Sequence, residues 1–160
     1  MRRKIILMSA LAAWTAVAAL SRAGDAQAQT TASVWDGVYT DAQANRGSAL
    51  YVQHCLVCHG ITLGGNNEAP PLTGEFIPDW AGMSLADLFD KISVTMPLSA
   101  PGTLSRANTA DILAFILKSN GFPGGSKELD TDGNALKAIS FDASKPPAAP
   151  SAKVKRARPQ

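Results

Sequence analysis

The chain has 160 residues, enough for one domain, and 46% of them are hydrophobic, which is typical of a protein with a buried core. The formal net charge of +2 hides an uneven distribution. Residues 29–142 hold six Lys/Arg against twelve Asp/Glu, whereas residues 143–160 hold five Lys/Arg and no acid. An acidic body argues against nucleic-acid binding, and two cysteines separated by only two residues exclude a disulfide-stapled scaffold.

The first 28 residues are predicted to be a secretory signal peptide. Three basic residues at positions 2–4 precede a mostly apolar stretch from Ile5 to Leu20, and Ala26-Gln27-Ala28 forms a small-x-small cleavage site. The apolar stretch is short for a membrane-spanning helix, which needs about 20 residues. The mature protein is therefore expected to begin near Gln29, with retention of residues 1–28 as a membrane anchor as the alternative.

Residues 29–39 are predicted to be an N-terminal extension of the domain proper, which takes residues 40–142. Residues 30–33 are small and polar and are expected to form a disordered lead-in. Trp35 and Tyr39 follow, and both rings are expected to pack against the domain.

A first helix is predicted over residues 41–54. Thr40 and Gln43 fit a capping box, in which the hydroxyl caps the helix and the glutamine side chain reaches back. Gly47 lies inside this helix, where glycine costs about 1 kcal/mol relative to alanine. Such a cost is reasonable where a second helix must approach closely.

Directly after this helix comes Cys55-Leu56-Val57-Cys58-His59, a C-x-x-C-H sequence, which is the attachment signature of c-type haem. Two thiols three positions apart on a helical turn can reach the two vinyl groups of one porphyrin. His59 lies four positions from Cys55, on the same helical face. The spacing therefore predicts one haem c, linked through Cys55 and Cys58 and ligated at its iron by His59.

Two other chemistries use the same residue types. Structural zinc usually takes four ligands in two separated pairs, and the only other histidine, His54, is adjacent to the motif. A thioredoxin-type redox motif needs a βαβ setting, and no strand-like runs flank these cysteines. A zinc half-site and a haem-free thiol oxidoreductase therefore stay open as the less favoured interpretations.

A loop is predicted after the motif, because glycines and asparagines between residues 60 and 67 disfavour regular structure. Ala69-Pro70-Pro71-Leu72 is then a rigid extended segment with few donors and free carbonyls. A carbonyl held near the ring of His59 can accept its second N–H, which fixes the tautomer and strengthens donation to iron. The alternative is a plain loop.

Trp80 can donate one hydrogen bond from its indole, with a haem propionate as the candidate acceptor and simple core packing as the alternative. A second helix is predicted over residues 84–94, where Ser84 and Asp87 fit a capping box. Its apolar stripe has helical spacing. The stripe consists of Leu85, Leu88, Phe89 and Ile92.

Met96-Pro97 ends the second helix. A thioether is a soft, neutral ligand that favours Fe(II) over Fe(III) and so raises the potential of a haem. Met96 lies 37 residues after His59, past a helix and in a loop, so it can reach the opposite haem face. Met83 is the other methionine of the mature chain and is interpreted as a core residue. Met96 is therefore the predicted second iron ligand.

A third helix is predicted over residues 109–119, with Asn108 as its cap and Asn120-Gly121 at its end. Its apolar face is spaced to cross Gly47 of the first helix. One short amphipathic turn is expected after Asp132.

The last predicted segment is a disordered basic tail over residues 143–160, because its Pro/Ala/Lys/Arg composition cannot bury a core. Contact with a membrane is expected only through this tail or through an uncleaved signal. The alternative is that the basic side chains of this short tail are only solvated, which is the usual state of a short charged segment.

Taken in order, these residues resemble class I cytochrome c over residues 40–121. The resemblance implies an all-α fold, with three main helices and loops wrapped around one covalently attached haem. It also implies that the first and last helices cross, that the Pro70 carbonyl holds His59, and that Met96 is the distal ligand. Residues 34–40, 121–123 and 136–139 are similar to small periplasmic cytochromes related to the haem domains of quinoprotein alcohol dehydrogenases. The motif residues are Gly47, Tyr51, Cys55, Cys58, His59, Pro70, Leu72, Gly74, Met96, Pro97, Ile112 and Phe115.

The expected function is one-electron transfer in the periplasm, within a respiratory or dehydrogenase-linked chain. With His59 and Met96 both on the iron, no position remains for a substrate, so a monomeric carrier is expected and not an enzyme, although it could be the cytochrome subunit of a dehydrogenase. The resemblance implies redox proteins as partners: a quinoprotein dehydrogenase as donor, and a terminal oxidase or another cytochrome as acceptor. The alternative is a haem domain with an open or labile distal site, such as a gas sensor or a peroxidase.

Overall fold

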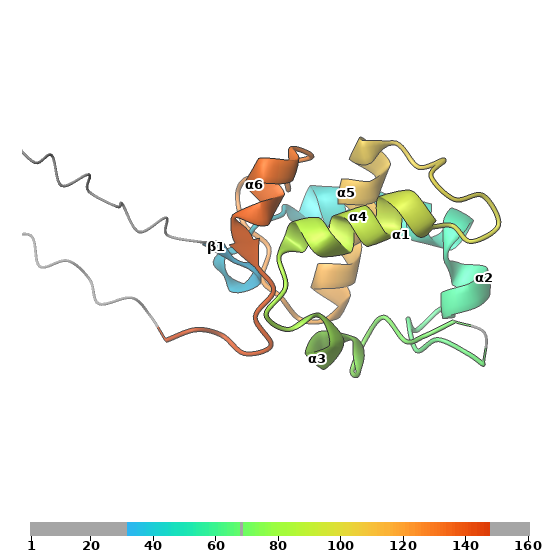
Figure 1. The fold of residues 1–160 in the computed structure, drawn as a ribbon, viewed down its shortest axis with the longest axis horizontal. Helices are drawn as coiled ribbons and strands as arrows, with labels where there is room; N and C mark the ends of the chain where they lie inside the picture. The colour runs from blue at the N-terminus through green and yellow to red at the C-terminus, as the bar shows by residue number, and fades with distance from the viewer. Residues whose placement is uncertain (1–31, 68, 148–160) are drawn as a thin grey trace, which may run out of the picture.

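The computed structural model describes residues 32–67 and 69–147. Over these residues the fold is helical, with three long helices, three short ones and two very short strands (Figure 1). This confirms the prediction of an all-α fold with three main helices. The predicted signal peptide and residues 148–160 of the predicted tail lie outside the described residues. The elements are β1 Ala32–Ser33, the 3-10 helix Val34–Asp36, α1 Asp41–His54, α2 Leu56–His59, α3 Phe76–Trp80, α4 Leu85–Thr95, α5 Arg106–Ser119, α6 Gly133–Lys137 and β2 Ile139–Ser140.

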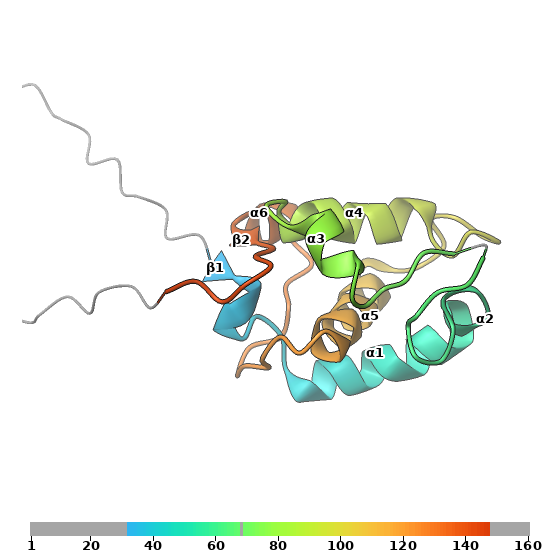
Figure 2. The same cartoon turned by 90° about the horizontal axis from the view of Figure 1, so that it is seen from below.

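The long helices form the frame of the domain. Seen from below, α5 lies between α1 and α4, with α2 at one end of the molecule and the two strands at the other (Figure 2). Among the described helices, none combines the length and the apolar character that crossing a membrane requires.

Helix α1 begins as predicted, with the Thr40 hydroxyl accepting a hydrogen bond of 3.1 Å from the Gln43 amide. The Gln43 side chain does not reach back to complete a capping box. It is buried, and its amide group donates to the Leu129 carbonyl at 3.1 Å and accepts from the Leu129 amide at 2.7 Å. Leu129 is buried but belongs to no helix or strand that would pair its backbone N–H and C=O groups. The Gln43 side chain supplies both of these hydrogen bonds.

Replacing Gln43 by leucine is expected to lower the free energy of unfolding by about 2–4 kcal/mol, because two buried backbone groups of Leu129 would lose their partners. Denaturant unfolding followed by circular dichroism measures the change. Asn45→Leu is the matched control, since Asn45 is exposed on the same helix and should stay within about 0.5 kcal/mol of the parent. Equal effects of the two substitutions would contradict the proposed anchoring role.

Helices α1 and α5 cross in close contact, as the sequence predicts. A Cβ added at Gly47 would lie 1.8 Å from the carbonyl oxygen of Asp111 on α5, so the two backbones touch at this glycine. The rings of Tyr51 and Phe115 pack one turn further along, with centroids 5.2 Å apart. Arg46 adds an ion pair to Asp111 with an N–O distance of 2.9 Å.

The N-terminal cap of α4 was predicted correctly, whereas the cap of α5 was not. Ser84 and Asp87 form the expected capping box of α4. Helix α5, however, begins at Arg106, and its cap is Ser105, whose hydroxyl accepts from the Asn108 amide at 3.1 Å. The assignment of Asn108 as the cap was wrong because Ser105 offers the same chemistry three residues earlier.

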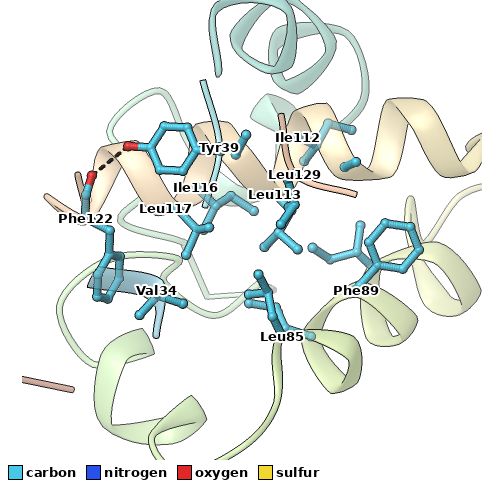
Figure 3. Close-up of a cluster of buried hydrophobic side chains, with 14 of the residues drawn as sticks. Val34, Tyr39, Leu85, Phe89, Ile112, Leu113, Ile116, Leu117, Phe122 and Leu129 are labelled. Atoms are coloured by element: carbon cyan, nitrogen blue, oxygen red, sulfur yellow. Dashed lines mark hydrogen bonds between the residues drawn. The ribbon is translucent and has the colours of Figure 1, made fainter. Parts of the chain in front are cut away.

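The core fills the space between α4 and α5. The whole predicted stripe of α4 is buried, and it meets the apolar face of α5 (Figure 3). Tyr39 of the N-terminal extension is buried in the same cluster, and its hydroxyl donates a 2.6 Å hydrogen bond to the Phe122 carbonyl (Figure 3).

The N-terminal strand and the segment after α6 meet at the side of the domain away from α2 (Figure 1). Strand β1 pairs with β2 in parallel, and the Ser33 hydroxyl donates to the Asp142 carboxylate at 2.6 Å. The prediction of disorder was therefore wrong for residues 32 and 33, because a two-residue strand carries no periodic signal. Trp35 docks as expected, with its indole N–H donating to the Asp142 carbonyl at 3.0 Å.

Candidate haem site

A cavity of about 460 Å³ lies between α2, the loop after it, and helices α3, α4 and α5. This volume is within the range of about 300–1,000 Å³ that is usual for ligand and cofactor clefts. All six site residues predicted from the sequence line this one cavity. They are Cys55, Cys58, His59, Pro70, Trp80 and Met96.

The imidazole of His59 is buried and oriented by a backbone group. Its Nδ1 lies 2.9 Å from the carbonyl oxygen of Pro70, as the sequence predicts for this proline. A carbonyl oxygen can only accept, so Nδ1 carries a proton, and in the neutral imidazole Nε2 then keeps its lone pair. The ring is thereby held in the tautomer that can ligate a metal through Nε2.

Cys55 lies between α1 and α2, and Cys58 lies within the short helix α2. The Cys55 carbonyl accepts from the amides of Cys58 at 3.1 Å and His59 at 2.9 Å, which brings both thiols to the same side as the imidazole. Burial, with a further contribution from Cys58, raises the pKa of the Cys55 thiol to about 11. Cys55 is half-buried and Cys58 is exposed, so the motif lies at the rim of the cavity.

Tyr51 supports this turn from α1. Its hydroxyl donates a 2.6 Å hydrogen bond to the carbonyl of Gly60, directly after His59. Burial raises the pKa of Tyr51 to about 12, so the phenol remains a proton donor at neutral pH.

Met96 is the C-cap residue of α4, with its amide donating to the Ile92 carbonyl at 3.0 Å. It is half-buried and lines the cavity together with His59. Met83, by contrast, is not among the residues that line this cavity, and it is 40% exposed. Of the two methionines among the described residues, the structure thus brings one to the site, and it is the predicted one.

Trp80 ends α3, a short helix that the sequence analysis did not predict. Its ring lies 6.1 Å from that of Phe76, between centroids, at an angle of 44°. Trp80 is half-buried and lines the cavity. Both packing and a polar contact to a cofactor are compatible with this position, and the propionate role stays a prediction.

The apolar wall of the cavity was present in the sequence but was not assigned to the site. It comes from the stripes of α4 and α5, whose helical spacing predicts a buried face without saying whether protein or cofactor covers it. The rim carries two charged side chains that sequence reasoning missed, Asp79 and Lys91. The wall residues are Leu88, Ile92, Ile112 and Ile116.

These residues fit a covalently attached haem. An apolar cavity of this size is lined by two thiols, by one thioether and by the imidazoles of His59 and His54, and it offers the attachment points and the ligand types of haem in cytochromes c. Throughout residues 32–67 and 69–147 there is no cluster of three or more His, Cys, Asp or Glu that could hold a metal ion. The zinc interpretation therefore finds no further ligands among these residues.

Comparisons with known proteins agree with this assignment. Residues 42–116 match the family described as cytochrome C oxidase, cbb3-type, subunit III, a range that includes the C-x-x-C-H motif and Met96. No match was found among curated proteins.

One solved structure is similar, the sulfane dehydrogenase SoxCD from Paracoccus pantotrophus. The TM-score is 0.45 at 22% identity, over 66% of this chain and 61% of that one. The matched region therefore spans less than two thirds of that protein, and a likeness of this level carries no functional argument. The family match over residues 42–116 and the helical fold together support a small c-type cytochrome domain, and a domain of this kind implies electron transfer through haem.

Proposed function

We propose that this domain is a periplasmic one-electron carrier with a single haem c, attached through Cys55 and Cys58 and ligated by His59 and Met96. The observation that carries the proposal is the convergence of all six predicted residues on one cavity. When bound, the haem supplies a one-electron couple at its iron. The protein's part is to bind the group, fix its ligands and limit the access of water.

Two features of the chain support stable ligation from both sides. The His59 ring is buried and held by the Pro70 carbonyl, so it needs little reorganisation to ligate a metal. Met96 is fixed by its position at the end of α4, and its thioether favours the reduced state. A fixed pair of ligands suits a carrier, since it leaves no open position for a substrate.

The surface suggests what kind of redox partner would dock. Several of the most exposed large apolar side chains lie around the C-x-x-C-H turn and the loop after α4, among them Val57, Ile61 and Leu98. The body carries an excess of acidic residues, so its partners are proposed to present basic rims around a small apolar contact. A quinoprotein dehydrogenase as donor and an oxidase or cytochrome as acceptor are proposed from the sequence resemblance alone.

Carbon monoxide tests the proposed ligation in the parent protein. With Met96 on the iron, the visible spectrum of the reduced protein is expected to change slowly and incompletely on addition of the gas, because the sixth position is taken. Rapid and complete binding would instead support the gas-sensor or peroxidase interpretation. Size-exclusion chromatography of native extracts would show whether the carrier is free or bound to a dehydrogenase.

A further inference from the structure

The loop between His59 and Leu72 is held in place by contacts that the C-x-x-C-H motif does not explain. We call the two residues that make these contacts, Gly65 and Asn120, the clamp residues. We infer that Gly65 and Asn120 are positioning residues, which hold the Pro70 carbonyl against His59 and thereby set how strongly the imidazole donates to the iron. The inference rests on the ligation by His59 proposed above. It assigns a function to two residues outside the C-x-x-C-H motif, one of them the C-cap residue of α5.

Gly65 lies between His59 and the backbone of the proline segment. Its amide donates to the His59 carbonyl at 2.9 Å, and its φ is +71°. A Cβ at this position would lie 2.5 Å from the Ala69 carbonyl oxygen and 2.7 Å from both the carbonyl carbon of Pro70 and the nitrogen of Pro71. The carbonyl carbon of Pro70 and the nitrogen of Pro71 belong to the peptide that carries the acceptor, so a side chain here must shift either that peptide or the backbone at residue 65.

Further bonds close the loop around this contact. The Asn66 amide donates to the Ala69 carbonyl at 2.9 Å, and the Asn66 side chain accepts from the Ala69 amide at 3.0 Å. The Leu72 amide donates to the Leu63 carbonyl at 2.7 Å. Leu63 itself is buried in a left-handed conformation, with φ of 59°, which a leucine adopts only where its surroundings impose it. The loop is therefore specified in detail and is not a flexible connection.

Asn120 ties this loop to the main frame of the fold. Its Nδ2 donates to the Leu72 carbonyl at 2.8 Å and to the Ile116 carbonyl at 2.9 Å, so one side chain joins the end of α5 to the proline segment. The Oδ1 atom is buried and has no hydrogen-bond partner among the described residues. A polar group left in this state is costly, which favours a specific role for the two donors over simple filling of space.

The position of the Pro70 carbonyl matters for the iron because it controls the electron density of the imidazole. An Nδ1–H that donates a strong hydrogen bond makes Nε2 a better donor and stabilises the oxidised metal. A displaced or more mobile carbonyl weakens that hydrogen bond. The reduced state of the iron then becomes more stable relative to the oxidised state, and the potential rises.

Gly65→Ala in the haem-bearing protein is the first test. Loss of a group that orients a metal ligand typically costs about 10–100-fold in metal affinity or activity, and we take the lower end of that range as a guide for the potential. We therefore expect the redox equilibrium with a fixed reference couple to shift about tenfold toward the reduced form, which is about 59 mV for one electron. Proton NMR of the reduced protein should also show faster solvent exchange of the His59 Nδ1–H.

Two neighbouring glycines separate the clash from other effects of the added methyl group. Gly64→Ala places a Cβ only against the Thr62 hydroxyl, at 3.2 Å, and involves no positive φ. Gly74→Ala imposes the same kind of strain, with φ of +64°, but meets nothing within 4 Å. Both variants should keep the potential and the Nδ1–H exchange rate of the parent. A shift in Gly74→Ala equal to that in Gly65→Ala would overturn the inference, because strain alone would then explain it.

Asn120→Leu removes the two donors without backbone strain, and it decides the matter if Gly65→Ala yields no haem-bearing protein. An upward shift in potential with faster Nδ1–H exchange is expected. Ser119→Ala is the control, since Ser119 bonds only to the Phe115 carbonyl of its own helix, at 2.8 Å. Parent values in Asn120→Leu would overturn the role of Asn120, and parent values in both clamp variants would overturn the inference as a whole. Failure of the proposed function is distinct, because it would appear as absent His/Met ligation in the parent spectrum.

Discussion

Replacing Met96 by alanine is expected to lower the midpoint potential by on the order of 0.1 V or more, a share of the about 0.8 V over which axial ligands set haem potentials. The loss follows because the thioether stabilises the reduced iron and alanine has no donor to replace it. The same substitution should open the sixth position to carbon monoxide. Spectroelectrochemical titration and the carbon monoxide difference spectrum of the reduced protein measure the two effects on one sample.

Met83→Ala is the control for this experiment. Met83 is 40% exposed and does not line the cavity. Its replacement should therefore leave both the potential and the slow, incomplete binding of carbon monoxide unchanged. A Met96→Ala variant with the potential of the parent would exclude Met96 as a ligand. If Met83→Ala alone lowered the potential, the assignment of the distal ligand would have to be reversed.

Replacing Gly47 by alanine is expected to destabilise the domain by at least about 3 kcal/mol, at the upper end of the usual cost of overpacking. The added Cβ would lie 1.8 Å from the Asp111 carbonyl oxygen, so α1 and α5 must separate. Since α5 also supplies Ile112 and Ile116 to the cavity wall, the yield of haem-bearing protein should fall as well. Guanidinium unfolding of the purified protein measures the stability.

Helix propensity alone predicts the opposite sign for this substitution, a gain of about 1 kcal/mol from glycine to alanine. The sign of the change therefore decides between the two effects. Ala49→Gly is the matched control at an exposed position of α1, where only propensity acts and a loss of about 1 kcal/mol is expected. A Gly47→Ala variant as stable as the parent would show that the helices do not approach at this residue.

The parts of the site that are local in sequence were predictable from sequence. Cys55, Cys58 and His59 lie within five residues, and their spacing predicts haem attachment. Met96 was predicted as the second ligand because a thioether next to a proline follows a strongly patterned helix. In both cases the residue type allows only a few chemical roles, and the structure then places these residues around one cavity.

Features that depend on contacts between distant segments were not predictable from local patterns. Gln43 was assigned to the first turn of α1, whereas its partner is Leu129, 86 positions away. Asn120 was predicted as a helix end, but its bond to Leu72 follows only from the packing of α5 on the proline segment. The short strands β1 and β2 were missed for the same reason, because each exists only through the other.

The central claim is that one haem is bound to this chain by two thioether links, and one measurement tests it directly. The purified protein is extracted with acidic organic solvent, and a mass spectrum and a visible spectrum are then recorded on the same sample. The account predicts that the red colour stays with the polypeptide and that the mass exceeds that of the chain by one haem. A colourless polypeptide with two titratable thiols would contradict it.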